Sequence, residues 1–340
     1  MIPWWAWVLF VVFVVAALLV DLFAFQREAH AVSRKEAAVT TAMWIGLGLA
    51  FTFVIWAWLG STAASEYLAA YLVEKSLSID NIFVFAIVFE YFMVPDAYRH
   101  RVLYWGIFGA LVLRFVFIIA GVALIEAFEP TLAIFGALLL FTAYRMVTHS
   151  GVELHPDENP AIRAVRRFVP MTTEYDEAKL FTRINGKRLA TPLFAVLIMI
   201  ETSDVIFAID SVPAVFGVTT EPFLVFSSNA FAILGLRALY FLLADSLKRF
   251  RYLNYGLAGV LAFVGSKMVA AQLWHVELPI WVSLTVIVVV VAISIVASLA
   301  AAPEPLEEEI SHSPLAGGLA GFGSRSNQPD EPATPARTQD

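Results

Sequence analysis

The stretch ATPLFAVLIMIETSDVIFAIDSVPAVF, residues 190–216, decides the class of fold. A helix needs about 20 mainly apolar residues to cross the hydrocarbon core of a bilayer, and this stretch is longer than that. It also contains three acids, Glu201, Asp204 and Asp210, although a charge that faces lipid at mid-membrane is costly. We therefore expect a membrane-spanning helix whose acids face other helices inside a bundle.

The whole chain has the composition of a membrane protein. Of its 340 residues, 60% are hydrophobic and 15% are charged, whereas a typical soluble domain has about 25% charged residues. The mean hydropathy is +0.77. The formal net charge of −7 argues against nucleic acid as the main partner. The chain has no cysteine, which excludes disulfides and thiolate metal sites within it.

Hydropathy predicts an all-α polytopic fold with nine transmembrane helices. In chain order, the predicted spans are residues 4–25, 37–59, 67–93, 101–125, 131–148, 190–216, 222–244, 255–273 and 279–301. Lys and Arg occur in the loops after spans 1, 3, 5 and 7 and are absent from the loops after spans 2, 4, 6 and 8. The positive-inside rule then places the N-terminus outside and the C-terminus in the cytoplasm. We expect a multi-pass protein of a bacterial inner membrane.

The spans divide the chain into six parts. In order, these are the first two spans (1–66), a three-span unit (67–148), a cytoplasmic loop with a small lobe (149–189), a second three-span unit (190–273), the last span (274–302) and a polar tail (303–340). The lobe ends in a predicted β-hairpin that turns at Asn185-Gly186, a dipeptide that favours a tight turn. The tail is rich in Pro, Gly and Ser and is expected to be disordered.

The two three-span units share landmarks at matching positions. Residues 80–84 (DNIFV) align with residues 204–208 (DVIFA). Arg114 follows the first aspartate by 34 residues, and Arg237 follows the second by 33. Because each unit has an odd number of spans, the two units enter the membrane from opposite sides. This predicts an inverted-topology repeat, in which many secondary transporters place an ion site near the midplane; a duplicated bundle without transport is the alternative.

The predicted spans contain more acids than bases, and the surplus suits a bound cation or protons. The candidate metal ligands are Glu74, Asp80, Glu201, Asp204 and Asp210, with Asn81, Ser78, Met199 and Asp21 as further candidates. The candidate charge-balancing residues are Arg114, Arg237, Lys75 and Lys267. Purely structural ion pairs are the alternative, but two arginines would still leave several acids without a partner.

Helical spacing places several of these residues on common faces. Glu74, Ser78 and Asn81 stand at i, i+4 and i+7 and therefore share one face of a helix. Glu201 and Asp204 share a face at i and i+3. We expect the two faces to meet, with Asp80 and Asp204 at equivalent positions holding the ion.

Asp210 lies on a different side of an ideal helix from Asp204, because the two are six residues apart. Pro213, three residues later, has no backbone N–H to donate. If the helix unwinds there, Asp210 would turn inward and carbonyl oxygens would become free to act as ligands.

The candidate ligands are carboxylate, amide, hydroxyl and carbonyl oxygens, which favour Mg²⁺, Ca²⁺ or Mn²⁺ over Cu or Zn. A thioether ligand, Met199, would favour Mn²⁺ over Mg²⁺.

At these residues the chain resembles the TerC family of membrane proteins, which includes the Alx-type manganese exporters and the tellurium-resistance TerC proteins. The resembling stretches are Asp21-Leu22 with the basic segment after it, EKSLSIDN at 74–81 and ETSDVIFAIDSVPA at 201–214. The resemblance covers about residues 10–275 and implies nine spans with two inverted three-helix units. It also implies export of Mn²⁺ or a similar divalent cation, with the acids of the two motifs as the metal-binding group.

Two functional hypotheses follow. The first is an exporter of a divalent cation, most directly Mn²⁺, with proton coupling left open and no resident cofactor. The second is a membrane scaffold that does not transport and serves as a partner subunit in a stress-resistance complex of the tellurite type, acting through the lobe at 149–189. An enzyme is not expected, because the chain has no His-Glu-x-x-His motif, no cysteine and no nucleophile beside a base. The oligomeric state stays open.

Overall fold

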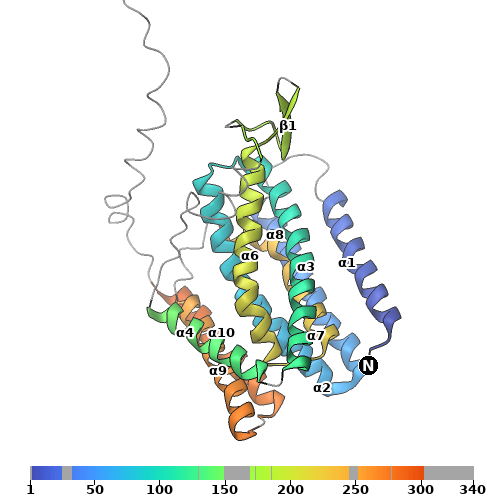
Figure 1. Ribbon diagram of the computed structural model, residues 1–340, viewed down its shortest axis with the longest axis vertical. Coiled ribbons are helices and arrows are strands. Elements are labelled where there is room, and N and C mark those ends of the chain that lie inside the picture. Colours follow the sequence, from blue (N-terminus) through green and yellow to red (C-terminus); the bar gives the residue numbers. More distant parts are fainter. Residues whose placement is uncertain are drawn as a thin grey trace, which may run out of the picture. The chain divides into compact units, whose positions relative to one another are not determined.

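A computed structural model describes residues 2–24, 33–128, 130–148, 169–172, 174–184, 186–244, 252–276 and 278–301 of the chain (Figure 1). The described part is almost entirely helical and contains one two-stranded antiparallel sheet. The predicted disordered tail at 303–340, the first part of the cytoplasmic loop at 149–168 and the turn residue Asn185 lie outside the described residues.

The elements, in chain order, are α1 (Trp4–Ala24), α2 (Arg34–Tyr91), α3 (Asp96–Ala127), α4 (Thr131–Thr148), β1 (Phe181–Ile184), β2 (Lys187–Ala190), α6 (Pro192–Phe216), α7 (Pro222–Leu234), α8 (Leu236–Leu243), α9 (Leu253–Trp274) and α10 (Ile280–Ala300). Within the described residues, eight helical segments are long and apolar enough to cross a membrane, with α7 and α8 counted together. The predicted class, a polytopic all-α membrane protein, is therefore confirmed.

Helix α2 reverses direction at Gly60, between two of the predicted spans. Gly60 has φ 89° and ψ −179°, a backbone conformation that glycine adopts at little cost. The Tyr67 hydroxyl donates a hydrogen bond to the Gly48 carbonyl at 3.0 Å, although 19 residues of straight helix would separate them by about 28 Å. The two halves of α2 therefore lie side by side, joined without a loop.

Helices α4 and α9 cross at unusually short range. A methyl group at Gly136 would lie 2.8 Å from the Gly265 carbonyl oxygen, and one at Gly265 would lie 2.7 Å from the Gly136 carbonyl oxygen. The glycines thus allow the two backbones to touch, as small residues do at membrane helix interfaces. Helix α10 packs against α9, so that α4, α9 and α10 lie together beside α6 (Figure 1).

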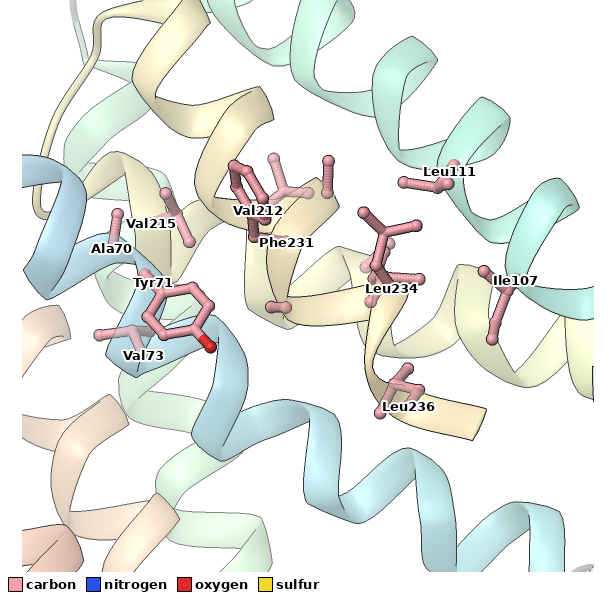
Figure 2. Close-up of a cluster of buried hydrophobic side chains, with 14 of the residues drawn as sticks. Ala70, Tyr71, Val73, Ile107, Leu111, Val212, Val215, Phe231, Leu234 and Leu236 are labelled. Carbon is pink, nitrogen blue, oxygen red and sulfur yellow. The ribbon is translucent and has the colours of Figure 1, made fainter. Parts of the chain in front are cut away.

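The apolar core is shared by helices that are far apart in the sequence. Figure 2 shows Tyr71 and Val73 of α2, Leu111 of α3, Val212 of α6 and Phe231 of α7 packed into one buried cluster. Helix α7 is the most enclosed of these helices, since every residue from Phe223 to Leu234 is buried. This packing fixes the mutual positions of α2, α3, α6 and α7, which carry the polar residues described below.

The predicted hairpin is present as β1 and β2. The strands are antiparallel, with Arg183 opposite Arg188. The Phe181 ring packs on Phe194 in the first turn of α6, with 4.7 Å between ring centroids. The Tyr175 hydroxyl donates to the Phe92 carbonyl at 2.6 Å, which connects this part of the lobe to the end of α2.

Candidate functional site

A buried polar cluster joins four helices. We define the central cluster as Glu74 and Asn81 of α2, Arg114 of α3, Asp204 and Ser211 of α6, and Asn229 of α7. Each of these residues has at most 3% of its surface exposed. Because buried polar groups destabilise a fold unless they are satisfied, such a cluster inside an apolar bundle points to a function.

Asp204 is held by donors on both of its carboxylate oxygens. Arg114 donates from Nε to Oδ2 at 3.3 Å and from Nη2 to Oδ1 at 3.0 Å. Asn81 donates from Nδ2 to Oδ1 at 3.2 Å. The guanidinium therefore binds the carboxylate through two parallel hydrogen bonds. This bidentate geometry strengthens the ion pair and fixes its orientation.

Glu74 forms the second ion pair of Arg114, through Nη1. The same nitrogen also donates to Ser211 Oγ at 3.3 Å and to Asn229 Oδ1 at 3.4 Å. Oε2 of Glu74 is buried and has no hydrogen-bond partner among the described residues. One guanidinium thus faces two carboxylates, and the ionised cluster carries a net charge of −1.

Helical periodicity explains why these residues meet. The face shared by Glu74, Ser78 and Asn81 on α2 points toward Asp204 on α6, as Asn81 and the common partner Arg114 show. Ser78 Oγ is buried, and within the described residues it has no hydrogen-bond partner. It stands one helical turn from Glu74 and adds a second unused oxygen to this face of α2.

Glu201 stands beside the central cluster on α6, one turn before Asp204. Its carboxylate presses against α3 at Gly109, where an added methyl group would collide with it. Its Oε2 atom is buried without a hydrogen-bond partner in the part of the chain that the structure describes. Glu201 is therefore a carboxylate close to the cluster that Arg114 does not neutralise.

Asp80 and Asp210 do not join the central cluster. Asp80 is half-buried and forms no hydrogen bond or ion pair with any described residue. Asp210 accepts a hydrogen bond from Thr142 Oγ1 of α4 at 2.8 Å. Helix α6 continues through Pro213 to Phe216, so the unwinding that would turn Asp210 inward is absent from it.

Asp21, a candidate ligand, pairs with an arginine. Its Oδ1 atom lies 2.5 Å from Nη2 of Arg237, and the same nitrogen approaches the Asp21 carbonyl oxygen at 3.4 Å. The pair is buried and links α1 to α8. Arg237 therefore balances an acid of the first helix, whereas Arg114 balances acids of α2 and α6.

The remaining candidates lie outside these contacts. Lys75 donates to the Ala232 carbonyl at 3.1 Å, and Lys267 donates to Ser283 Oγ at 3.1 Å. Neither lysine forms an ion pair with a described residue. Met199 is buried on α6.

Two members of the central cluster were not singled out in the sequence, Ser211 and Asn229. Asn229 ends the run Ser227-Ser228-Asn229 inside the predicted span 222–244, and three consecutive polar residues at that depth were the available signal. Ser211 stands seven residues after Asp204, which places it on the same face of α6.

The ligand set offered by the cluster is limited. Among the described residues, no three His, Cys, Asp or Glu side chains lie close enough together to hold a metal ion. A cation here would combine Glu74 and Asp204 with hydroxyl, amide or carbonyl oxygens. Such all-oxygen sets suit hard divalent cations.

Comparison with known proteins identifies the family. Residues 59–305 match the model of the family described as "Integral membrane protein TerC family". The chain belongs to the TerC family. The matched range includes the whole central cluster, whereas α1 and its Asp21 precede it.

Curated relatives within and near this family cover most of the chain. It is 46% identical over 293 residues to an uncharacterized membrane protein of Myxococcus xanthus, with 86% of this chain and 91% of the relative covered. It is 46% identical to proteins named "Putative membrane-bound redox modulator Alx" from Salmonella typhi, over 299 residues (85% and 92% covered), and from Escherichia coli strain K12, over 290 residues (83% and 90% covered). No solved structure was found to match the chain.

Proposed function

We propose that this TerC-family protein exports a divalent cation, most directly Mn²⁺, across a bacterial inner membrane. The observation that carries the proposal is the meeting of Glu74 and Asp204, from the two predicted three-span units, in the buried centre of the bundle. An ionised carboxylate in the membrane interior carries a large free-energy cost. The oxygen atoms around these two acids suit Mg²⁺, Ca²⁺ or Mn²⁺ as ligands. The choice of Mn²⁺ rests on the family resemblance.

We infer nine membrane crossings, with the N-terminus outside and the C-terminus in the cytoplasm. Helix α2 has 58 residues, which would extend about 87 Å if straight, far beyond the hydrocarbon thickness of about 30 Å. Two crossings joined at Gly60 fit this length, and the alternation of Lys and Arg between loops supports the orientation. Units 67–148 and 190–273 then run in opposite directions, as in inverted-repeat transporters.

Proton coupling belongs to the same proposal. A carboxylate must lose its proton to bind a metal, so release of the metal frees the site to take up protons. Glu201, which has no cationic partner among the described residues, is the proposed relay next to the cluster. No covalent chemistry is involved, and the transported ion is the substrate.

The alternative is a membrane scaffold that does not transport. The relatives from Salmonella typhi and Escherichia coli are named putative membrane-bound redox modulators, but this chain has no cysteine and hence no thiol to exchange electrons. A scaffold would act through the lobe at 149–189, part of which is anchored by Tyr175 to Phe92. Deletion of the lobe would then abolish function, whereas neutral substitutions at Glu74 and Asp204 would be silent.

The deciding experiment is a flux assay in proteoliposomes with Mn²⁺, Ca²⁺, Mg²⁺ and Zn²⁺, with and without a pH gradient. Wild-type protein is expected to move Mn²⁺, and Asp204→Asn is expected to abolish the flux because Asp204 supplies a ligand. Asp96→Asn is the matched control, since Asp96 is exposed at the start of α3 and pairs with Arg99. Absence of flux in the wild type, or normal flux in Asp204→Asn, would refute the proposal.

A further inference from the structure

Arg114 occupies the positions that a cation would need. Asp204 accepts from Arg114 on both oxygens and from Asn81 on one of them. A divalent cation ligated by both oxygens of Asp204, at about 2.0–2.6 Å, would need the edge of the carboxylate that the guanidinium now occupies. Ligation of an ion by both oxygens of Asp204 therefore requires the guanidinium to release this carboxylate.

The charges lead to the same conclusion. Glu74 and Asp204 together carry −2, and the guanidinium carries +1. A divalent cation neutralises both acids by itself, whereas a divalent cation together with Arg114 would leave a net charge of +1 in a buried site. Repulsion between two cations at such short range in a medium of low dielectric is strong, so the ion and the guanidinium compete for the acids.

The structure also provides neutral acceptors for a displaced guanidinium. Nη1 of Arg114 already contacts Ser211 Oγ at 3.3 Å and Asn229 Oδ1 at 3.4 Å. Both belong to helices that face α3, and neither oxygen carries a formal charge. These oxygens can keep Nη1 hydrogen-bonded after the carboxylates have bound an ion, which lowers the cost of releasing the guanidinium.

We propose that Arg114 is a tethered partial substitute for the transported cation, which pairs with Glu74 and Asp204 and lowers their combined charge from −2 to −1 whenever the ion has left them. The inference rests on the proposed function and adds a role to it. An inverted-repeat carrier that releases its ion must return across the membrane before the next cycle. Two ionised acids without any counter-charge would oppose that return. Arg114 offsets one of the two negative charges from within the chain, and a proton taken up on release offsets the other.

This role separates two modes of transport. Net efflux requires the return of the carrier without its ion, whereas exchange of Mn²⁺ for Mn²⁺ moves the carrier loaded in both directions. Removal of the guanidinium should therefore lower the rate of net efflux and leave the rate of exchange nearly unchanged. An arginine that only supports the fold would affect both modes alike.

The test compares the two modes in proteoliposomes loaded with radioactive Mn²⁺. Dilution into Mn²⁺-free buffer measures net efflux, and dilution into buffer with unlabelled Mn²⁺ measures exchange. In Arg114→Gln, net efflux is expected to fall about seventyfold, the equivalent of about 2.5 kcal/mol for an uncompensated charge at mid-membrane, while exchange stays within about twofold of wild type. Arg114→Lys keeps the charge without the paired geometry and is expected to retain more net efflux.

Arg237→Gln is the matched control, because Arg237 is also buried but pairs with Asp21 outside the cluster. It is expected to slow both modes alike. Equal loss of both modes in Arg114→Gln, or the same separation of modes in Arg237→Gln, would overturn the inference while leaving the proposed function intact. Wild-type protein without flux in either mode would instead refute the proposed function.

Correct folding is checked by a single symmetric elution peak in detergent. If Arg114→Gln fails this check, Arg114→Lys carries the test. Net efflux in Arg114→Lys is then expected to fall more than exchange, and an equal fall would contradict the role assigned to Arg114.

Discussion

The buried pair of Asp21 and Arg237 shows what a single residue contributes. The two side chains meet at 2.5 Å between α1 and α8. Removal of one partner from a buried ion pair leaves an uncompensated charge and typically destabilises a protein by about 3–5 kcal/mol. We therefore expect Asp21→Asn to lower the free energy of unfolding by about this amount, measured by thermal denaturation in detergent.

The double variant Asp21→Asn, Arg237→Gln provides the control for that prediction. It removes both charges, so the two losses should not add, as is usual for residues in contact. A double variant whose loss of stability equals the sum of the two single losses would show that the pair is not coupled. Asp96→Asn, at an exposed position, is expected to leave the melting temperature unchanged.

Gly109 sets the position of Glu201. A methyl group on Gly109 would collide with the Glu201 carboxylate, which is the mobile end of a flexible side chain, so Gly109→Ala should fold while displacing that acid. We expect reduced Mn²⁺ flux with a melting temperature close to wild type. Gly46→Ala is the matched control because nothing lies within 4 Å of a methyl group there. Equal flux in the two variants would show that Glu201 takes no part in transport.

At the scale of elements, the crossing of α4 and α9 depends on two glycines. In Gly136→Ala the new methyl group would meet the Gly265 carbonyl at 2.8 Å, and a backbone atom cannot move aside as a side chain does. Overpacking of this kind costs about 1–3 kcal/mol. The expected result is a lower melting temperature, to be compared with Gly46→Ala; an unchanged value would mean that the helices separate freely.

The hairpin gives a pH prediction outside the membrane helices. Hydrogen bonds from the Thr182 hydroxyl and from Lys179 hold the pKa of Asp176 below its ordinary value. A lowered carboxylate pKa stabilises the folded form above the ordinary value of about 3.9, and this stabilisation is lost as the pH falls below it. Hydrogen exchange in β1 and β2 should therefore rise in acid more than intrinsic rates predict. Asp176→Asn should abolish that extra rise.

At the scale of the whole molecule, the absence of cysteine makes the proposed topology directly testable. Any cysteine introduced into the chain is its sole thiol. Ser61→Cys, next to the reversal at Gly60, should react with a membrane-impermeant reagent from outside the cell, whereas Lys187→Cys in β2 should react only after permeabilisation. Both positions are exposed. The opposite pattern would invert the assigned orientation.

The sequence predicted the helices and the shared face of Glu74 and Asn81 because both follow from hydrophobicity and a fixed helical period. It did not predict the partner of each charge. Arg114 and Arg237 stand at matching repeat positions, yet Arg237 pairs with Asp21, and Asp80 has no ionic partner among the described residues. Spacing along a helix shows which residues share a face, but the neighbour of that face depends on packing between distant helices.

The complete enclosure of α7 has a consequence for how the protein is made. Its residues from Phe223 to Leu234 are all buried by other helices, and the segment that it forms with α8 carries Asn229 and Arg237. During synthesis this segment leaves the ribosome after α6, and lipid alone offers those polar groups no partner. Its insertion into the membrane should therefore depend on earlier helices of the chain, which supply partners for these polar groups at the translocon. In a glycosylation-mapping assay the isolated segment should insert poorly, and insertion should recover when residues 1–221 precede it.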